Sequence, residues 1–193
     1  LRCGDVLADV AFLAMDLERL GAGRAAPKLL DWYDEFAGER HPASLAHHYV
    51  AYRALVRAKV RGLRAAQGFA DAQSESMALL DQCLRHLRAS APVLALVGGS
   101  PGVGKTTIAE HLAQADGMVL VSSDPLRKEL AGLSPEVGRV GPIDEGIYSP
   151  DFTSRTYGEL LQRAERLLKA GESVVLDATW HDASQRERAR EIA

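Results

Sequence analysis

The chain has 193 residues, of which 47% are apolar and 25% charged, and its formal net charge is −3. This composition is that of a soluble globular protein, and the slight negative charge argues against a polycationic nucleic-acid-binding protein. Cys3 and Cys83 form neither a disulfide framework nor a metal-ligand spacing, which suits a reducing cytoplasm. No apolar run could span a bilayer and no signal peptide is visible, so we expect a cytoplasmic protein without a membrane partner.

Residues 1–90 are predicted to form an all-helical segment. Apolar residues recur at helical spacing from Val6 to Leu20, and Gly21 follows as a stop. A second helix is expected to start at Pro27 and to end at Gly38, because proline suits a first helical position and glycine suits a helix end.

Two further helices complete this segment. Ser44 is a plausible N-cap for a long third helix, and Asp71 or Ser74 begins a fourth. The side chains expected on their apolar faces are Leu45, Tyr49, Tyr52, Val56, Val60 and Leu63 on the third helix, and Met77, Leu80, Leu84 and Leu87 on the fourth.

A basic stripe runs along the third predicted helix, formed by Arg53, Arg57, Arg61 and Arg64. A nucleic-acid groove is one interpretation, but residues 1–90 hold 12 basic and 11 acidic side chains, and no aromatics interleave on that face. A solvated face is favoured, with the arginines paired to Asp31, Asp34, Glu35 or Glu39. His47 and His48 are adjacent and point in different directions, so they do not form a helical metal pair.

After the boundary at residues 89–92, strands and helices alternate, which predicts a parallel α/β sheet over residues 91–193. Glycine and proline recur without periodicity over 131–150, where we expect a mobile loop. Strands are expected at 93–97, 118–122 and 173–176, and helices at 104–115, over 157–168 and from Ser184 onward.

The most specific motif lies between the first of these strands and its helix. Residues 99–106 fit G-x-x-x-x-G-K-S/T, a phosphate-binding loop in which glycines let successive backbone N–H groups face one anion. Lys105 would neutralise the β- and γ-phosphates, and the Thr106 hydroxyl would bind Mg²⁺. The alternative is a plain glycine turn. The predicted nucleotide-binding residues are Gly99, Ser100, Pro101, Gly102, Val103, Gly104, Lys105, Thr106 and Thr107.

Two carboxylates follow the other strands, at the edge of the sheet where ligands bind in such folds. Asp177 ends the third strand and is predicted to hold Mg²⁺ with Thr106; its alternative role is to cap the next turn. Asp124 follows the second strand and is the predicted general base or acceptor-orienting group. Its alternative role is to N-cap a helix that has Pro125 in first position. His181 could touch a ligand, but a plain loop residue is favoured.

Three segments carry a resemblance: residues 99–106, Ser123-Asp124-Pro125-Leu126-Arg127-Lys128, and Val174–Thr179 followed by Arg186. Together they resemble the small P-loop kinase family, which includes gluconate kinase-like, polynucleotide kinase-like and zeta-toxin-like proteins. The resemblance implies that Asp124 activates the acceptor hydroxyl and that Arg127 helps to bind substrate. Arg186 matches a family arginine, which could contact phosphate; a solvated or ion-paired surface residue is the alternative. The family's lid arginines would lie beyond Ala193, so the α/β fold is expected to be incomplete at its C-terminus.

A second resemblance, to the C-terminal lobe of aminoglycoside phosphotransferase-like kinases, rests on two segments. They are Gly4–Glu18, which begins with the pattern G-D-x-x-x-D-V-A, and Tyr52–Val60. The resemblance implies that Asp5 and Asp9 cap and brace helices, that this half is catalytically inert, and that it packs on an upstream kinase-like lobe. Because the chain opens on Leu1 and stops at Ala193 inside a helical pattern, we expect an excerpt of a longer protein.

Taken together, the motifs predict ATP- and Mg²⁺-dependent phosphoryl transfer to a small-molecule hydroxyl, with Lys105, Asp124 and Arg127 as the catalytic residues. An ATP-binding regulatory or stress-response module without a dedicated acceptor is the alternative. Phosphorylation of nucleic-acid ends is a weaker third hypothesis.

Overall fold

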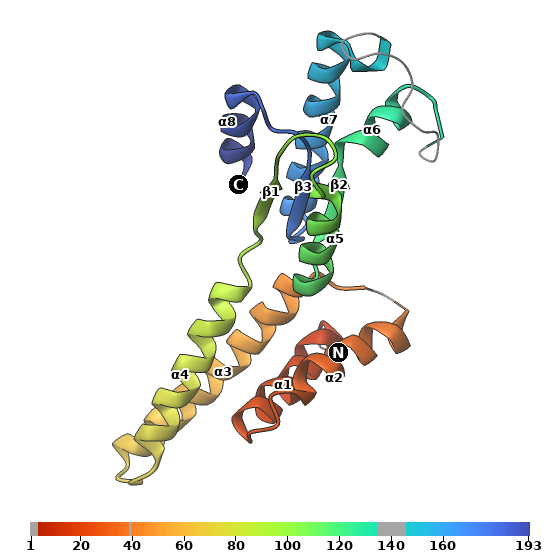
Figure 1. The fold of residues 1–193 in the computed structure, drawn as a ribbon. Helices are drawn as coiled ribbons and strands as arrows, with labels where there is room; N and C mark the ends of the chain where they lie inside the picture. The colour runs from red at the N-terminus through yellow and green to blue at the C-terminus, as the bar shows by residue number, and fades with distance from the viewer. Residues whose placement is uncertain (1–3, 39, 135–145) are drawn as a thin grey trace. The chain divides into compact units, whose positions relative to one another are not determined.

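The computed structural model describes residues 4–38, 40–134 and 146–193, and the chain divides into two compact units, Leu1–Ala91 and Pro92–Ala193 (Figure 1). Within the described ranges, no helix combines the length and the apolar content that crossing a membrane requires.

The first unit is all-helical. Its helices are α1 (Val6–Arg19), α2 (Ala25–Ala37), α3 (Ala43–Ala66) and α4 (Ala72–Ala89), with α3 and α4 forming an antiparallel pair (Figure 1). Asp5 caps α1 as expected, because its carboxylate accepts a hydrogen bond from the Leu7 amide at 2.9 Å. Two helices begin earlier than the sequence predicted. Helix α2 begins at Ala25, before Pro27, and Ser44 lies inside the first turn of α3 rather than capping it.

The prediction of which residues α3 and α4 bury was largely wrong. Tyr52, Val60 and Leu63 are 54%, 53% and 59% exposed, and α3 instead buries small residues. Alanines at a helix contact let the neighbouring helices approach closely, so the larger side chains remain on the outer face. The core of this unit comprises Ala11, Ala14, Met15, Ala26, Val50, Ala51, Ala54, Ala58, Leu79 and Cys83.

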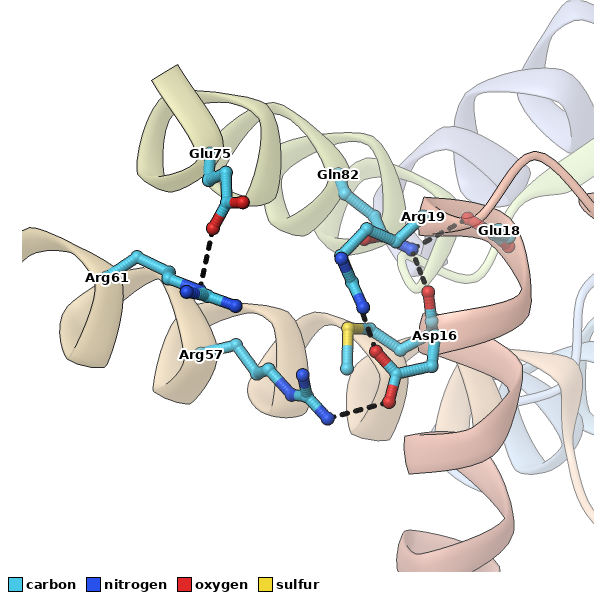
Figure 2. Close-up of polar contacts among 8 residues, drawn as sticks. Asp16, Glu18, Arg19, Arg57, Arg61, Glu75 and Gln82 are labelled. Carbon is cyan, nitrogen blue, oxygen red and sulfur yellow. Dashed lines mark hydrogen bonds and ion pairs between the residues drawn. The ribbon is translucent and has the colours of Figure 1, made fainter. Parts of the chain in front are cut away.

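The arginine stripe of α3 is paired, but with acidic residues other than those expected. Its ion pairs are Arg53–Asp9 at 2.8 Å, Arg57–Asp16 at 2.7 Å and Arg61–Glu75 at 2.8 Å, the last two visible in Figure 2. The partners lie on α1 and α4, which pack against α3, whereas Asp34 of α2 pairs with His41. Since three of the four cations are neutralised, the stripe offers little charge to a nucleic acid. Each half-exposed pair contributes about 0–1 kcal/mol to stability.

A histidine pair that the sequence analysis missed links α3 to α4. His47 Nδ1 lies 2.8 Å from His86 Nδ1, and His86 Nε2 lies 2.9 Å from a Glu18 carboxylate oxygen. Gln82 donates to the same carboxylate at 3.0 Å (Figure 2). It also donates to the Met15 carbonyl at 3.0 Å. Only one proton fits between the two Nδ1 atoms, so the arrangement cannot hold both rings fully protonated.

This pair makes the stability of the chain sensitive to mild acid. Burial, and next the neighbouring His86, lower the pKa of His47 from its ordinary value of 6.5. The unfolded chain then binds a proton more readily than the folded chain, so this contribution to stability is complete above pH 6.5 and is lost as the pH falls below it. In His47→Leu we expect the urea midpoint, followed by circular dichroism, to fall less between about pH 7.5 and about pH 5.5 than in the unsubstituted chain.

The exposed neighbour supplies the control, because His48→Leu should keep the original pH dependence. Equal pH dependence in the unsubstituted chain and in His47→Leu would refute the assignment.

The second unit contains a parallel sheet in the order β1-β3-β2. Its elements are β1 (Leu94–Val97), α5 (Lys105–Asp116), β2 (Val119–Ser122), α6 (Ser123–Leu130), the short 3₁₀ helix η1 (Gly146–Tyr148), α7 (Pro150–Lys169), β3 (Val174–Asp177) and α8 (Ala183–Ile192). Val97 and Ser122 are both in register with Asp177, so all three strands end at one edge of the sheet.

The central strand β3 is buried throughout and packs on both sides. Val175 packs with Ala109 and Ala113 of α5, while Val174 and Leu176 belong to the cluster formed with α7. This alternation follows from the two-residue period of a strand. The predicted fold class, a P-loop-type α/β sheet with flanking helices preceded by a helical segment, is confirmed.

The loop expected over 131–150 lies partly outside the described residues, which omit 135–145. Of its described ends, 146–148 form η1 and Pro150 begins α7, so that end of the predicted loop is helical.

Candidate functional site

The loop after β1 has the backbone that its glycines predict. Gly99 and Gly104 adopt φ of +144° and +85°, and Gly104 caps the N-terminus of α5. The positive φ favours glycine at position 99, and a Cβ there would also crowd a methyl group of Val103 at 3.3 Å. The first amides of α5 have no partner within the helix, and the helix dipole adds positive potential at the same end. The turn between these glycines, residues 100–103, is exposed.

The cationic residue of the loop folds back over it. Lys105 Nζ donates to the Ser100 carbonyl at 3.0 Å, which places the ammonium group beside the turn. Thr107 follows in the first turn of α5 and is exposed.

The predicted magnesium ligands are in direct contact. The Thr106 hydroxyl donates to a carboxylate oxygen of Asp177 at 2.8 Å, although 71 residues separate them in sequence. Mg²⁺ in phosphate sites is held by one or two protein oxygens together with waters and phosphate oxygens. A hydroxyl and a buried carboxylate beside the phosphate loop therefore fit this ion, and among the described residues no group of three or more His, Cys, Asp or Glu is arranged to hold a metal ion.

Asp124 lies in the first turn of α6 and does not serve as its N-cap, a position taken by Ser122, so Pro125 is not in first position either. One carboxylate oxygen pairs with Lys128 Nζ at 2.7 Å, and the Tyr148 hydroxyl lies 3.4 Å from the other. The Asp124 side chain is 56% exposed, whereas that of Lys128 is buried. The lysine thus holds one oxygen of a half-exposed carboxylate, and the Tyr148 hydroxyl is the neighbour of the other oxygen.

Arg127 is only 8% exposed and has a bracing role that the sequence did not predict. Its Nη1 donates to the Ile147 carbonyl at 2.5 Å and to the Thr153 hydroxyl at 3.0 Å, which ties α6 to η1 and α7. Burial lowers the pKa of the guanidinium from its usual value. The predicted contact of Arg127 with substrate stays a prediction.

These side chains meet at one cavity of about 640 Å³, a size suited to a small-molecule site. Its lining residues are Pro101, Lys105, Thr106, Ser123, Asp124, Arg127, Tyr148, Thr153, Asp177, Ala178, Thr179 and His181. The structure therefore brings Lys105, Thr106, Asp124, Arg127 and Asp177 together, as the strand-end rule anticipated.

Tyr148, Thr153 and Thr179 line the cavity without having been predicted as site residues, and His181 lines it although the sequence analysis favoured a plain loop residue there. Thr179 and His181 could have been found by following β3 two to four residues past Asp177, since they lie at the same edge of the sheet. Tyr148 and Thr153 carry no comparable signal, because η1 and α7 bring them to the cavity through tertiary packing.

Comparison with known proteins gives a family and relatives of unknown role. Residues 94–193 match the model of a protein family that is described as "AAA domain". Uncharacterized protein Rv2004c of Mycobacterium tuberculosis and uncharacterized protein Mb2027c of Mycobacterium bovis are each 42% identical over all 193 residues. The chain spans 39% of the length of each of these relatives. No solved structure matches it significantly.

Proposed function

We propose, from the premise that this chain belongs to the AAA domain family, that its second unit is an ATP- and Mg²⁺-dependent kinase acting on the hydroxyl group of a small molecule. One observation carries the proposal: the contact between Thr106 and Asp177 lies in the same cavity as Lys105 and Asp124. A plain glycine turn after β1 would not need polar side chains from the ends of β2 and β3 in the same cavity.

In the proposed reaction, the loop amides and Lys105 bind the β- and γ-phosphates of ATP and neutralise their charge. Thr106 and Asp177 would hold Mg²⁺, which supplies charge neutralisation between the phosphates when bound. The contribution of the chain is then mainly placement, because phosphoryl transfer demands little covalent chemistry of the protein.

Asp124 would act on the acceptor. Its oxygen not held by Lys128 accepts the hydrogen bond of the acceptor hydroxyl and then the proton, as the hydroxyl oxygen forms a bond to the γ-phosphorus. The bond between that phosphorus and the β–γ bridging oxygen breaks, and ADP leaves with the electron pair. Lys128 keeps the carboxylate in place during this step.

Two features favour a small acceptor over a nucleic acid. The cavity has the size of a small-molecule site, and the Pro92–Ala193 unit contains 11 basic and 15 acidic residues. Nucleic-acid binding would need a basic surface and would show steep salt dependence.

Transfer of labelled phosphate from ATP to a panel of hydroxyl compounds tests the proposal. We expect Mg²⁺-dependent labelling of at least one small molecule. Slow release of phosphate with no labelled acceptor would favour the regulatory module instead, and salt-sensitive labelling of oligonucleotides would favour the nucleic-acid alternative.

We also propose that the first unit is the C-terminal part of an aminoglycoside phosphotransferase-like lobe and packs on a preceding kinase-like lobe. Asp5 caps α1 and accepts a hydrogen bond from Tyr49, and Asp9 pairs with Arg53, so both acids brace helices as that resemblance implies. The exposed large side chains of α3 would form the contact. Amides of α3 should exchange more slowly in a chain that carries such a lobe; unchanged exchange would contradict the contact.

A further inference from the structure

The turn after β3 contains a strained residue. Trp180 has φ of +52°, and it is the one non-glycine residue with positive φ in the described parts of the chain. An aromatic residue rarely adopts this conformation, and strained residues persist where the surrounding structure holds them.

One side of this turn is held by α7. The Tyr157 hydroxyl accepts a hydrogen bond from the Trp180 amide at 3.1 Å and lies 3.0 Å from the Thr179 hydroxyl. The two aromatic rings also pack edge to face, with centroids 5.2 Å apart. The indole N–H donates to the Leu176 carbonyl at 3.3 Å, so both ends of the Trp180 side chain are fixed.

Arg186 of α8 holds the far end of the turn. Its Nη1 donates to the Trp180 carbonyl at 2.5 Å and to the His181 carbonyl at 2.9 Å. The arginine that the kinase resemblance would place near phosphate therefore holds the backbone of the turn.

The phosphate loop holds the turn as well. The Gly99 amide donates to the Thr179 carbonyl at 3.3 Å, and a Cβ at Gly98 would lie 3.4 Å from Trp180. The strained conformation is thus supported from α7, α8 and the phosphate loop. Its neighbours on either side, Thr179 and His181, both line the cavity.

We propose that His181 is a further substrate-contacting residue, held over the cavity by the Trp180 turn, and that its imidazole N–H donates a hydrogen bond to the phosphoryl group in transfer. The inference rests on the proposed kinase function. The sheet order supports this placement, because β3 lies between β1, which leads into the phosphate loop, and β2, which leads into Asp124. The segment that follows β3 therefore lies between the phosphate loop and Asp124, and the transferred phosphoryl group must pass through that space. Tyr157 and Arg186 are then positioning residues.

The test compares the affinity of the whole chain for Mg²⁺-ADP alone and for Mg²⁺-ADP with aluminium fluoride, which mimics the phosphoryl group in transfer. His181→Ala should weaken binding of the fluoride complex by about tenfold or more while leaving the affinity for Mg²⁺-ADP unchanged. His181→Gln, which keeps an N–H donor, should restore much of this loss. His111→Ala alters an exposed histidine of α5 away from the cavity and should change neither affinity.

Each other outcome is informative. If aluminium fluoride tightens nucleotide binding equally in the unsubstituted chain and in His181→Ala, the role of His181 is wrong while the kinase proposal stands. Equal losses of both affinities would indicate a structural role only, which also overturns the inference. If fluoride does not tighten binding in the unsubstituted chain, the proposed function itself fails.

The positioning role is tested separately with Tyr157→Phe, which keeps the ring and removes the hydroxyl. This variant should reproduce the selective loss for the fluoride complex, because the Trp180 amide and the Thr179 hydroxyl lose a partner. A Tyr157→Phe chain that folds, by circular dichroism, and binds the fluoride complex normally would contradict that role.

Discussion

Lys105→Ala is expected to lower the affinity of the chain for Mg²⁺-ATP by at least about tenfold and its phosphoryl transfer by about 100- to 1000-fold. The ammonium group lies beside the phosphate loop, 3.0 Å from the Ser100 carbonyl, and no backbone amide can replace its full charge. Alanine favours the helix that begins at this position, so α5 should persist. Binding of a fluorescent ATP analogue and transfer of labelled phosphate measure the two effects.

Lys169→Ala is the matched control, because Lys169 is an exposed lysine paired with Glu165 at the end of α7. It should bind and turn over ATP as the unsubstituted chain does. If Lys105→Ala were equally unaffected, the loop would not be a phosphate site.

Asp124→Asn is expected to reduce acceptor phosphorylation by about 100- to 10,000-fold with little change in Mg²⁺-ATP affinity. Asparagine keeps the shape of the side chain but cannot accept the proton of the acceptor hydroxyl. A module that only binds nucleotide would be nearly indifferent to the change. Labelled-phosphate transfer and nucleotide binding are measured on the same preparation.

Because Lys128 loses its charged partner in this variant, thermal unfolding is compared as well. Asp151→Asn, which removes another carboxylate from a helical first turn, is the control and should transfer phosphate normally. An active Asp124→Asn chain would remove Asp124 from the mechanism.

The sheet and the contact between Thr106 and Asp177 could be predicted because local rules determine them. The glycine-rich motif requires a strand before it and a helix after it, and parallel strands end at the same edge. Thr106 and Asp177 therefore meet although they lie far apart in sequence.

Other features depend on tertiary packing and were missed. The sequence pattern of α3 offers two apolar stripes, one of large side chains and one of alanines, and only the packing of α1 and α4 selects the alanine stripe. The contact between His47 and His86 joins residues 39 positions apart with no motif to connect them. The left-handed backbone at Trp180 is equally invisible in sequence, since it arises from Tyr157, Arg186 and the phosphate loop together.

Isothermal titration of the chain with ATP, in the presence of Mg²⁺ and again with the metal removed by a chelator, tests the phosphate site most directly. The account predicts saturable binding to a single site that weakens markedly without Mg²⁺, because Thr106 and Asp177 then lose the ion that links them to the phosphates. Titrations that release no heat of binding in either condition, from a chain shown to be folded, would contradict it.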